Sequence, residues 1–199
     1  MIAIIDYNVG NLFSVKNALD YIGLASEITR DAKTIEQADE MIIPGVGAFP
    51  DAMHELKKTG LVPAIRKEAV KKPLLGICLG MQILFDKGYE FEECDGLGLI
   101  PGEVKLIPVT DRKIPHMGWN ELIFTNPCPL LKSVPERSYV YFVHSYMADT
   151  DEKNIAASVD YGVKIPALVQ NGNVYGAQFH PEKSGDLGLE MLRTFGKLV

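Results

Sequence analysis

The chain has 199 residues, a length that predicts one domain, over residues 1–199, with a sizeable hydrophobic core. Its charged content of 23% and formal net charge of −6 are ordinary for a globular protein, and no Lys/Arg-rich run suggests nucleic-acid binding. No apolar stretch approaches a membrane span, and the apolar residues 1–5 are too few for a signal peptide. Three cysteines, an odd number, suggest free thiols, so we expect a cytoplasmic protein.

The first half of the chain alternates short apolar strands with helical segments. Strands are predicted at residues 2–5, 25–28, 41–43 and 73–77, and helices at 12–22, 31–38, 50–58 and 62–71. This alternation predicts an α/β fold with a mostly parallel central sheet flanked by helices. In such a sheet the site lies beyond the carboxyl ends of the strands. The loops at Asn8, Gly45 and Cys78 should therefore share one edge.

The second half is divided into shorter pieces by glycine and proline residues. Strands are predicted at 104–107, 122–124, 139–146, 155–159, 167–170 and 174–179, followed by an amphipathic helix at 187–198. Asn171-Gly172-Asn173 lies between two of these strands and predicts a β-hairpin. We therefore expect a smaller, partly antiparallel sheet beside the parallel one.

The stretch Gly76-Ile77-Cys78-Leu79-Gly80-Met81-Gln82 follows a predicted strand and begins a helical pattern that extends toward Gly88. The glycines two residues to each side of Cys78 match the nucleophile elbow, a tight strand–helix turn that exposes a nucleophile. At a helix N-terminus the dipole favours a thiolate, and the N–H of Leu79 would face an oxyanion beside the sulfur. A buried cysteine in a glycine-rich turn is the alternative that this stretch alone leaves open.

A second informative stretch is Phe179-His180-Pro181-Glu182. Acyl chemistry at a cysteine needs a base for the thiol proton and a third group that holds the imidazole tautomer. We predict that His180 is the base and that Glu182 orients it. If Cys78 were absent, a structural histidine at the end of a strand would be the preferred interpretation of His180. Cys94 and Cys128 have no comparable context. No metal-ligand spacing is present, so we expect neither a metal nor another cofactor.

Together these stretches resemble the class I glutamine amidotransferases, and the resemblance covers essentially the whole chain. It is most marked for the glutaminase subunits of imidazole glycerol phosphate synthases. Four further stretches carry it: residues 4–12, 44–49 (Pro-Gly-Val-Gly-Ala-Phe), 115–120 (Pro-His-Met-Gly-Trp-Asn) and 141–146 (Tyr-Phe-Val-His-Ser-Tyr). Asn8 departs from this pattern, since relatives commonly have glycine there, but asparagine tolerates a left-handed backbone.

The resemblance implies that glutamine is hydrolysed to glutamate through a Cys78 thioester. The ammonia would pass to a cyclase subunit in a heterodimer, which forms imidazole glycerol phosphate and AICAR in histidine biosynthesis. The oxyanion hole would combine the N–H of Leu79 with the N–H of Val46 or Gly47. Because a peptide beside glycine rotates at low cost, we expect this loop to be misaligned until the partner binds. A plain strand-to-helix turn is the simpler interpretation of its glycines.

The resemblance also assigns residues to the substrate and to the partner. Around glutamine it places Gln82 and the backbone near His144, Ser145 and Tyr146. At the surface that meets the cyclase it places Met117, Trp119, Asn120, Tyr141 and Lys183. From composition alone, Trp119 could equally be a core residue, and Gln82 could be a solvated helix amide.

Three other functions stay open. Another amidotransferase subunit, such as one for anthranilate or pyridoxal phosphate, would share the catalytic residues and differ in its partner. A free-standing cysteine hydrolase, of the γ-glutamyl hydrolase or peptidase-like kind, would be fully active alone. A catalytically inactive binding module on the same fold would need none of Cys78, His180 and Glu182, and their joint presence argues against it.

Overall fold

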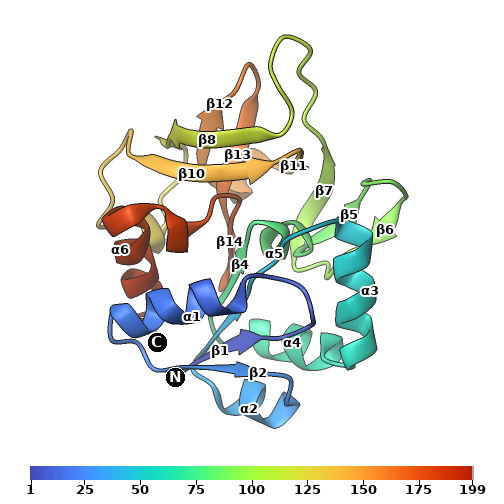
Figure 1. Cartoon of the computed structure of the whole chain (residues 1–199), viewed down its shortest axis with the longest axis vertical. Coiled ribbons are helices and arrows are strands. Elements are labelled where there is room, and N and C mark those ends of the chain that lie inside the picture. The colour runs from blue at the N-terminus through green and yellow to red at the C-terminus, as the bar shows by residue number, and fades with distance from the viewer. Residues whose placement is uncertain (199) are drawn as a thin grey trace.

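A computed structural model describes residues 1–198; the last residue of the predicted domain, Val199, lies outside the described residues. Its central feature is an eight-stranded sheet with the order β2-β1-β3-β4-β14-β13-β12-β9 (Figure 1). Neighbouring strands are parallel from β2 to β14 and antiparallel from β14 to β9. The bounds are β1 Ile2–Ile5, β2 Ser26–Thr29, β3 Glu40–Ile43, β4 Leu74–Ile77, β9 Ile123–Phe124, β12 Ile155–Asp160, β13 Lys164–Asn171 and β14 Val174–Ala177.

Helices cover both faces of the parallel part of this sheet. They are α1 Leu12–Tyr21, α2 Ala32–Gln37, α3 Phe49–Thr59, α4 Val62–Ala69 and α6 Gly185–Phe195. Because side chains alternate along a strand, Ile2 and Ile4 of β1 pack with α1 and α6, whereas Ala3 and Ile5 pack with α2, α3 and α4. In Figure 1, α1 and α6 accordingly lie together, away from α3 and α4. Two apolar cores thus enclose a sheet whose strands are buried on both sides.

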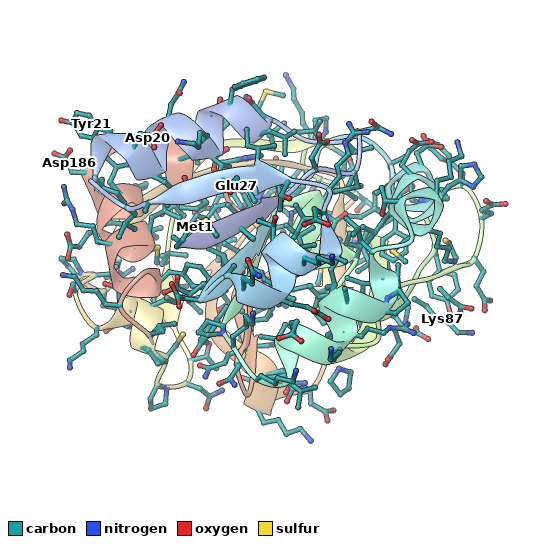
Figure 2. The ribbon with its side chains drawn as sticks, turned by 90° about the horizontal axis from the view of Figure 1, so that it is seen from below. Met1, Asp20, Tyr21, Glu27, Lys87 and Asp186 are labelled. Atoms are coloured by element: carbon teal, nitrogen blue, oxygen red, sulfur yellow. The ribbon has the colours of Figure 1, made fainter. Side chains whose placement is uncertain are left out.

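The N-terminal edge of the sheet is visible from below in Figure 2. Strand β2 forms this edge and carries the exposed Glu27, a charge of the kind that discourages pairing with a second sheet. Asp20 and Tyr21, labelled at the end of α1, are exposed as well. Side-chain caps begin the neighbouring helices: Asn11 accepts the N–H of Ser14 at 3.2 Å, and Asp31 accepts that of Thr34 at 3.1 Å.

Two smaller sheets stand beside the carboxyl ends of the parallel strands. One has the order β11-β7-β5-β6, and the other is the antiparallel pair β10-β8. The bounds are β5 Phe85–Gly88, β6 Cys94–Asp95, β7 Ile100–Leu106, β8 His116–Glu121, β10 Tyr139–His144 and β11 Tyr146–Asp149. The predicted hairpin at Asn171-Gly172-Asn173 is confirmed, because β13 and β14 pair antiparallel on either side of it. The three cysteines, all among the described residues, form no disulfide.

The helical pattern predicted to extend from Cys78 toward Gly88 is wrong beyond its first turn. Helix α5 covers only Leu79–Gln82, and the following residues form β5. The carbonyl oxygen of Ile83 accepts the N–H of Leu97, and that of Leu84 accepts two N–H groups from residues 99 and 100. These long-range partners replace the helical hydrogen bonds that the local spacing suggested.

The strand predicted at residues 139–146 is also not continuous. It divides at Ser145 into β10 and β11, which belong to different sheets. Strand β8 was not predicted at all, although it pairs with β10 along its whole length. The division at Ser145 turns the backbone of residues 143–146 toward the elbow after β4.

A half-buried lysine, Lys72, connects the region after α4 to the end of α2. The Nζ of Lys72 donates to the carbonyl oxygens of Ile35 at 2.9 Å, Glu36 at 2.8 Å and Ala38 at 2.6 Å. It also lies 3.3 Å from the buried carboxylate of Glu68. One ammonium group therefore satisfies helix-end carbonyls and a buried charge together.

We expect Lys72→Met to lower the free energy of unfolding by about 3 kcal/mol, because hydrogen bonds to charged groups and a buried ion pair are lost. Lys67→Met is the matched control, since the Lys67 side chain is 58% exposed and its ion pair with Glu36 contributes little. Urea denaturation measures both values. Equal losses in the two variants would contradict the structural role of Lys72.

Candidate active site

Cys78 lies between β4 and α5 with φ 54° and ψ −111°, a backbone conformation that non-glycine residues rarely adopt. The two flanking glycines make this turn possible. A Cβ on Gly80 would lie 1.8 Å from the carbonyl oxygen of Ile43, and one on Gly76 would lie 2.5 Å from that of Gly80. The predicted strand–turn–helix elbow around the cysteine is therefore confirmed.

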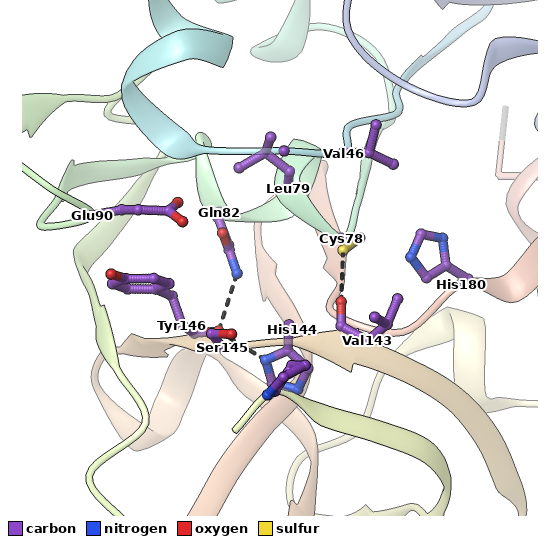
Figure 3. Close-up of a pocket in the computed structure, with 12 residues that line it drawn as sticks. Val46, Cys78, Leu79, Gln82, Glu90, Val143, His144, Ser145, Tyr146 and His180 are labelled. Atoms are coloured by element: carbon purple, nitrogen blue, oxygen red, sulfur yellow. Dashed lines mark hydrogen bonds between the residues drawn. The ribbon is translucent and has the colours of Figure 1, made fainter. Parts of the chain in front are cut away.

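His180 reaches the cysteine because β14 pairs with β4. In this parallel pair Ala177 is in register with Ile77, so the residues that follow each strand emerge at the same sheet edge. His180 follows β14 and lines the same cavity as Cys78 (Figure 3). The sequence alone could not show that Cys78 and His180 lie close together. The pairing of β14 with β4 brings them to the same cavity.

Glu182 is hydrogen-bonded to the far side of the imidazole. Nδ1 of His180 lies 2.8 Å from Oε1 of Glu182, and the two side chains are 2% and 1% exposed. The second oxygen of Glu182 is buried and has no hydrogen-bond partner among the described residues. Burial lowers the pKa of His180, but hydrogen-bonding and charge interactions with Cys78 and Glu182 outweigh it and raise that pKa to about 9. The imidazole can therefore carry a proton at neutral pH beside the sulfur.

A cavity of about 270 Å³ opens in front of the sulfur (Figure 3). Nine residues predicted for the site line it: Val46, Gly47, Cys78, Leu79, Gln82, His144, Ser145, Tyr146 and His180. Three more were not predicted, namely Glu90, Pro115 and Val143. Gln82 is buried and hydrogen-bonded in the cavity wall, so the solvated-amide interpretation is wrong.

Glu90 is the charged group that sequence reasoning missed. It follows β5 and reaches the cavity only because that segment is a strand, which the sequence did not indicate. Its Oε2 accepts the N–H of Phe49 at 2.8 Å, and burial raises the pKa of the carboxyl. Figure 3 shows Glu90 across the cavity from His180, so the cavity wall carries an acid on the side away from this histidine.

The loop proposed for the second oxyanion donor is anchored at one end. The hydroxyl of the buried Tyr7 donates to the carbonyl oxygen of Pro44 at 2.6 Å. Further along, Val46 is 46% exposed, and Gly47 has φ +97° with open space, free of other atoms to 4 Å, where a Cβ would stand. The loop thus has a held base and an open tip. Its oxyanion role stays a prediction.

Two buried histidines lie at the cavity wall: His144 lines the cavity, and His116 is hydrogen-bonded to it. Nδ1 of His144 lies 2.8 Å from the carbonyl oxygen of Tyr146, and Nε2 of His144 lies 2.9 Å from Nδ1 of His116. A carbonyl oxygen only accepts, so His144 donates from Nδ1 and its Nε2 accepts the N–H of His116. Burial is the main cause that lowers the pKa of both imidazoles to about 4. Both rings are therefore neutral at neutral pH.

We expect the free energy of unfolding to fall as the pH drops from 6.5 to about 4, because the unfolded chain protonates His116 and His144 in this range and the folded chain does not. Urea denaturation at several pH values measures the slope. His116→Gln, which can still donate to His144, should lose part of the slope even if it is less stable overall. An unchanged slope in this variant would exclude the histidine pair as its source.

The predicted partner surface lies on β8 and β10. Met117 and Trp119 are 61% and 55% exposed, which excludes the core interpretation of the tryptophan. The ring of Tyr141 lies edge-on to Trp119 at 6.1 Å, and Lys183 directly follows Glu182 in the chain. Asn120 differs from the rest of the set.

Asn120 projects from the other face of β8. Its Nδ2 donates to the carbonyl oxygen of Asp160 at 3.0 Å and lies 3.3 Å from Nε2 of His116. Residues alternate across a strand, so a neighbour of Trp119 cannot share its face. The side chain of Asn120 is therefore occupied inside the chain, whereas the interface role of the other residues stays a prediction.

Within residues 1–198, no helix is long and apolar enough to cross a membrane. In the same range, no group of three or more His, Cys, Asp or Glu side chains is placed to hold a metal ion.

Residues 3–198 match the protein family described as "Glutamine amidotransferase class-I". The chain is 52% identical over 200 residues to "Imidazole glycerol phosphate synthase subunit HisH" of Bacillus thuringiensis subsp. konkukian, over 100% of this chain and 95% of that protein. The protein of the same name from Bacillus cereus is 50% identical over the same shares of both chains.

Two solved structures show the same fold. "Structure of PurLQS from Thermotoga maritima" has a TM-score of 0.77 at 21% identity, over 98% of this chain and 96% of that chain. "Crystal structure of glutamine amidotransferase" has a TM-score of 0.76 at 20% identity, over 98% and 100%. The predicted α/β fold, with its mostly parallel sheet and smaller sheets, is confirmed.

Proposed function

Since the chain belongs to the class I glutamine amidotransferases, we propose that it is the glutaminase subunit of an imidazole glycerol phosphate synthase in histidine biosynthesis. The observation that carries the proposal is that Cys78 and His180 line one cavity of about 270 Å³ and that Glu182 is hydrogen-bonded to His180. Relatives named for this subunit align with the whole chain. The proposed partner is the cyclase subunit, in a heterodimer, and the proposed location is the cytoplasm.

The cavity offers complementary groups to both ends of glutamine. Cys78 would face the carboxamide carbon, and the carboxylate of Glu90 would face the α-ammonium group. Nε2 of Gln82 donates to the carbonyl oxygen of Tyr146 at 3.1 Å and to Oε1 of Gln178 at 3.0 Å. Both of its N–H groups are therefore used inside the chain, and its Oε1 is the atom that can accept a hydrogen bond from the substrate.

The reaction follows from these positions. The Cys78 thiolate attacks the carboxamide carbon, and the carbonyl electron pair moves onto oxygen. The oxyanion would be held by the N–H of Leu79 and that of Val46 or Gly47; losing one such donor costs roughly 10²–10³ in rate. Protonated His180 gives its proton to the leaving nitrogen, so ammonia departs and a thioester forms.

Hydrolysis of the thioester then regenerates the enzyme. Neutral His180 takes a proton from water, whose oxygen attacks the acyl carbon. Collapse of the second tetrahedral species releases glutamate and returns the sulfur to its thiolate form beside protonated His180. Glu182 holds the same imidazole tautomer in both halves of the reaction.

Partner binding is proposed to align the oxyanion loop. The loop base is held by Tyr7, whereas no atom lies within 4 Å of the Cβ position at Gly47. The docking surface would be formed by Met117, Trp119, Tyr141 and Lys183, where an exposed tryptophan next to a tyrosine is a typical anchor of an interface. Tyr141 lies on β10, the strand that also supplies Val143 and His144 to the cavity wall, so docking and catalysis would be adjacent.

The test is glutamate release from glutamine, with and without the cyclase subunit and its ribonucleotide ligand. We expect strong stimulation by the partner that disappears in Cys78→Ala and persists in the matched control Cys94→Ala, which lies outside the cavity. Equal, high activity of the chain alone would favour a free-standing hydrolase. No activity in either setting would favour another acceptor enzyme or an inactive binding module.

A further inference from the structure

A buried glutamine lies directly behind the nucleophile. Gln178 follows β14 and is 0% exposed. Its Nε2 lies 3.8 Å from Sγ of Cys78, within reach of an N–H···S hydrogen bond, and its Oε1 accepts from Gln82 at 3.0 Å. Neither the catalytic pair nor the cavity lining accounts for this residue. A fully buried amide is retained only where its polar atoms have partners.

The orientation of the Gln178 amide is determined by the backbone. The carbonyl oxygen of Tyr146 can only accept, so the atom of Gln82 that faces it at 3.1 Å is Nε2. The same nitrogen supplies the hydrogen bond to Gln178, which must therefore present Oε1 to Gln82. The remaining end of the Gln178 amide, Nε2, faces the sulfur. One carbonyl thus sets the direction of the whole chain of amides.

The hydrogen bond from His144 to the Tyr146 carbonyl supports the same orientation of the two amides. His144 donates from Nδ1 to the carbonyl oxygen of Tyr146 at 2.8 Å, so this oxygen accepts two hydrogen bonds and donates none. Rotation of the Gln82 amide would place its oxygen against that carbonyl and leave two buried acceptors facing each other, which is unfavourable because neither oxygen can donate. The N–H directed at Cys78 is therefore a built feature of the site.

We propose that Gln178 is a positioning residue that donates a hydrogen bond to the Cys78 sulfur and so stabilises the thiolate that attacks the substrate. A thiol is a weak acceptor when neutral and a stronger one when ionised, so a donor behind the sulfur favours ionisation. The inference deepens the proposed function, because it assumes that Cys78 is the nucleophile. It assigns the second amide of the site to the enzyme's own sulfur rather than to the substrate.

Other titratable and polar groups also lie around Cys78. The substitutions of Gln178 described below leave all of them in place. His180 follows β14 and faces the sulfur, and Glu182 is hydrogen-bonded to the far side of its ring. Tyr7, which follows β1, interacts electrostatically with Cys78, and His144, at the end of β10, lines the same cavity. The carbonyl oxygen of Val143 lies 3.8 Å from Sγ and accepts from the neutral thiol only, so it opposes ionisation. Gln178 donates to the sulfur and is therefore expected to favour the thiolate, whereas the Val143 carbonyl favours the neutral thiol.

The experiment is the pH dependence of Cys78 alkylation by iodoacetamide in the full chain, with the modified peptide quantified by mass spectrometry. Gln178→Met removes the donor and adds no charge, and we expect it to raise the alkylation midpoint by about one pH unit. Glutamine turnover below the midpoint should fall about tenfold in parallel. Gln178→Asn, whose shorter amide does not reach the sulfur, should give the same direction and serves if the Met variant fails to fold.

The matched control is Tyr175→Leu, which removes the packing of a β14 ring against Phe195 and should leave the alkylation midpoint at the wild-type value. A midpoint that stays at the wild-type value in both Gln178 variants would overturn the inference, whatever happens to turnover. A different result would contradict the proposed function, namely that the wild-type chain with its partner releases no glutamate from glutamine. The two failures are therefore distinguishable.

Discussion

Glu182→Gln should lower glutamine turnover by about 10⁴-fold while the chain remains folded, by analogy with the loss of the orienting acid in a catalytic triad. In the wild type, Nδ1–H of His180 donates a hydrogen bond to Oε1 of Glu182, which leaves Nε2 of the imidazole to exchange a proton with the sulfur. A glutamine amide can present an N–H to the same nitrogen and so favour the wrong tautomer. It also removes the negative charge that helps to raise the pKa of His180.

Two measurements check this prediction. Single-turnover glutamate release with saturating partner gives the rate, and its pH profile should show a lower pKa for His180, because one of the interactions that raise it is lost. Glu190→Gln on α6 is the matched control, since its carboxylate pairs with Arg193 and is 38% exposed. If the Glu182 variant turns over glutamine at nearly the wild-type rate, Glu182 does not orient His180 for catalysis.

Gly80→Ala should abolish the elbow and lower the free energy of unfolding by about 4 kcal/mol or more, which only severe steric conflicts reach. The added methyl group would lie 1.8 Å from the carbonyl oxygen of Ile43 and 2.8 Å from its carbonyl carbon, so either β3 or α5 must move. Either movement displaces Cys78, because α5 begins directly after it. We therefore expect loss of glutaminase activity together with loss of stability.

The matched control for this substitution is Gly172→Ala in the hairpin between β13 and β14. Gly172 has φ +58° and no atom within 4 Å of the added position, so the cost is limited to backbone strain of about 1–2 kcal/mol. Urea denaturation compares the two variants, and glutamate release with the partner reports the site. A Gly80 variant as stable as the Gly172 variant would show that the elbow can relax, contrary to the geometry.

The local sequence was sufficient for the parts of the molecule whose partners are close in the chain. The spacing of Gly76, Cys78 and Gly80 predicted the elbow, since a tight turn depends on the residues that form it. Glu182 lies two residues from His180, so their hydrogen bond could be anticipated as well. Short apolar runs and turn residues predicted most strands of the central sheet for the same reason.

The residues missed were those whose role depends on distant partners. Phe85–Gly88 is a strand because β7 offers it backbone partners, and Glu90 reaches the cavity only as a consequence. The hydrogen bond from Asn120 to the carbonyl oxygen of Asp160 likewise depends on β8, a strand that the local pattern did not reveal.

The sequence by itself thus determined which groups can do the chemistry: a cysteine in a glycine elbow, and a histidine with its carboxylate. The tertiary structure decided how they meet. Pairing of β4 with β14 brings Cys78 to His180, and the break at Ser145 brings the Tyr146 carbonyl to Gln82 and hence Gln178 to the sulfur. The physical reason is that backbone hydrogen bonds between strands far apart in sequence determine where each strand ends, and local residue preferences carry no information about the partner.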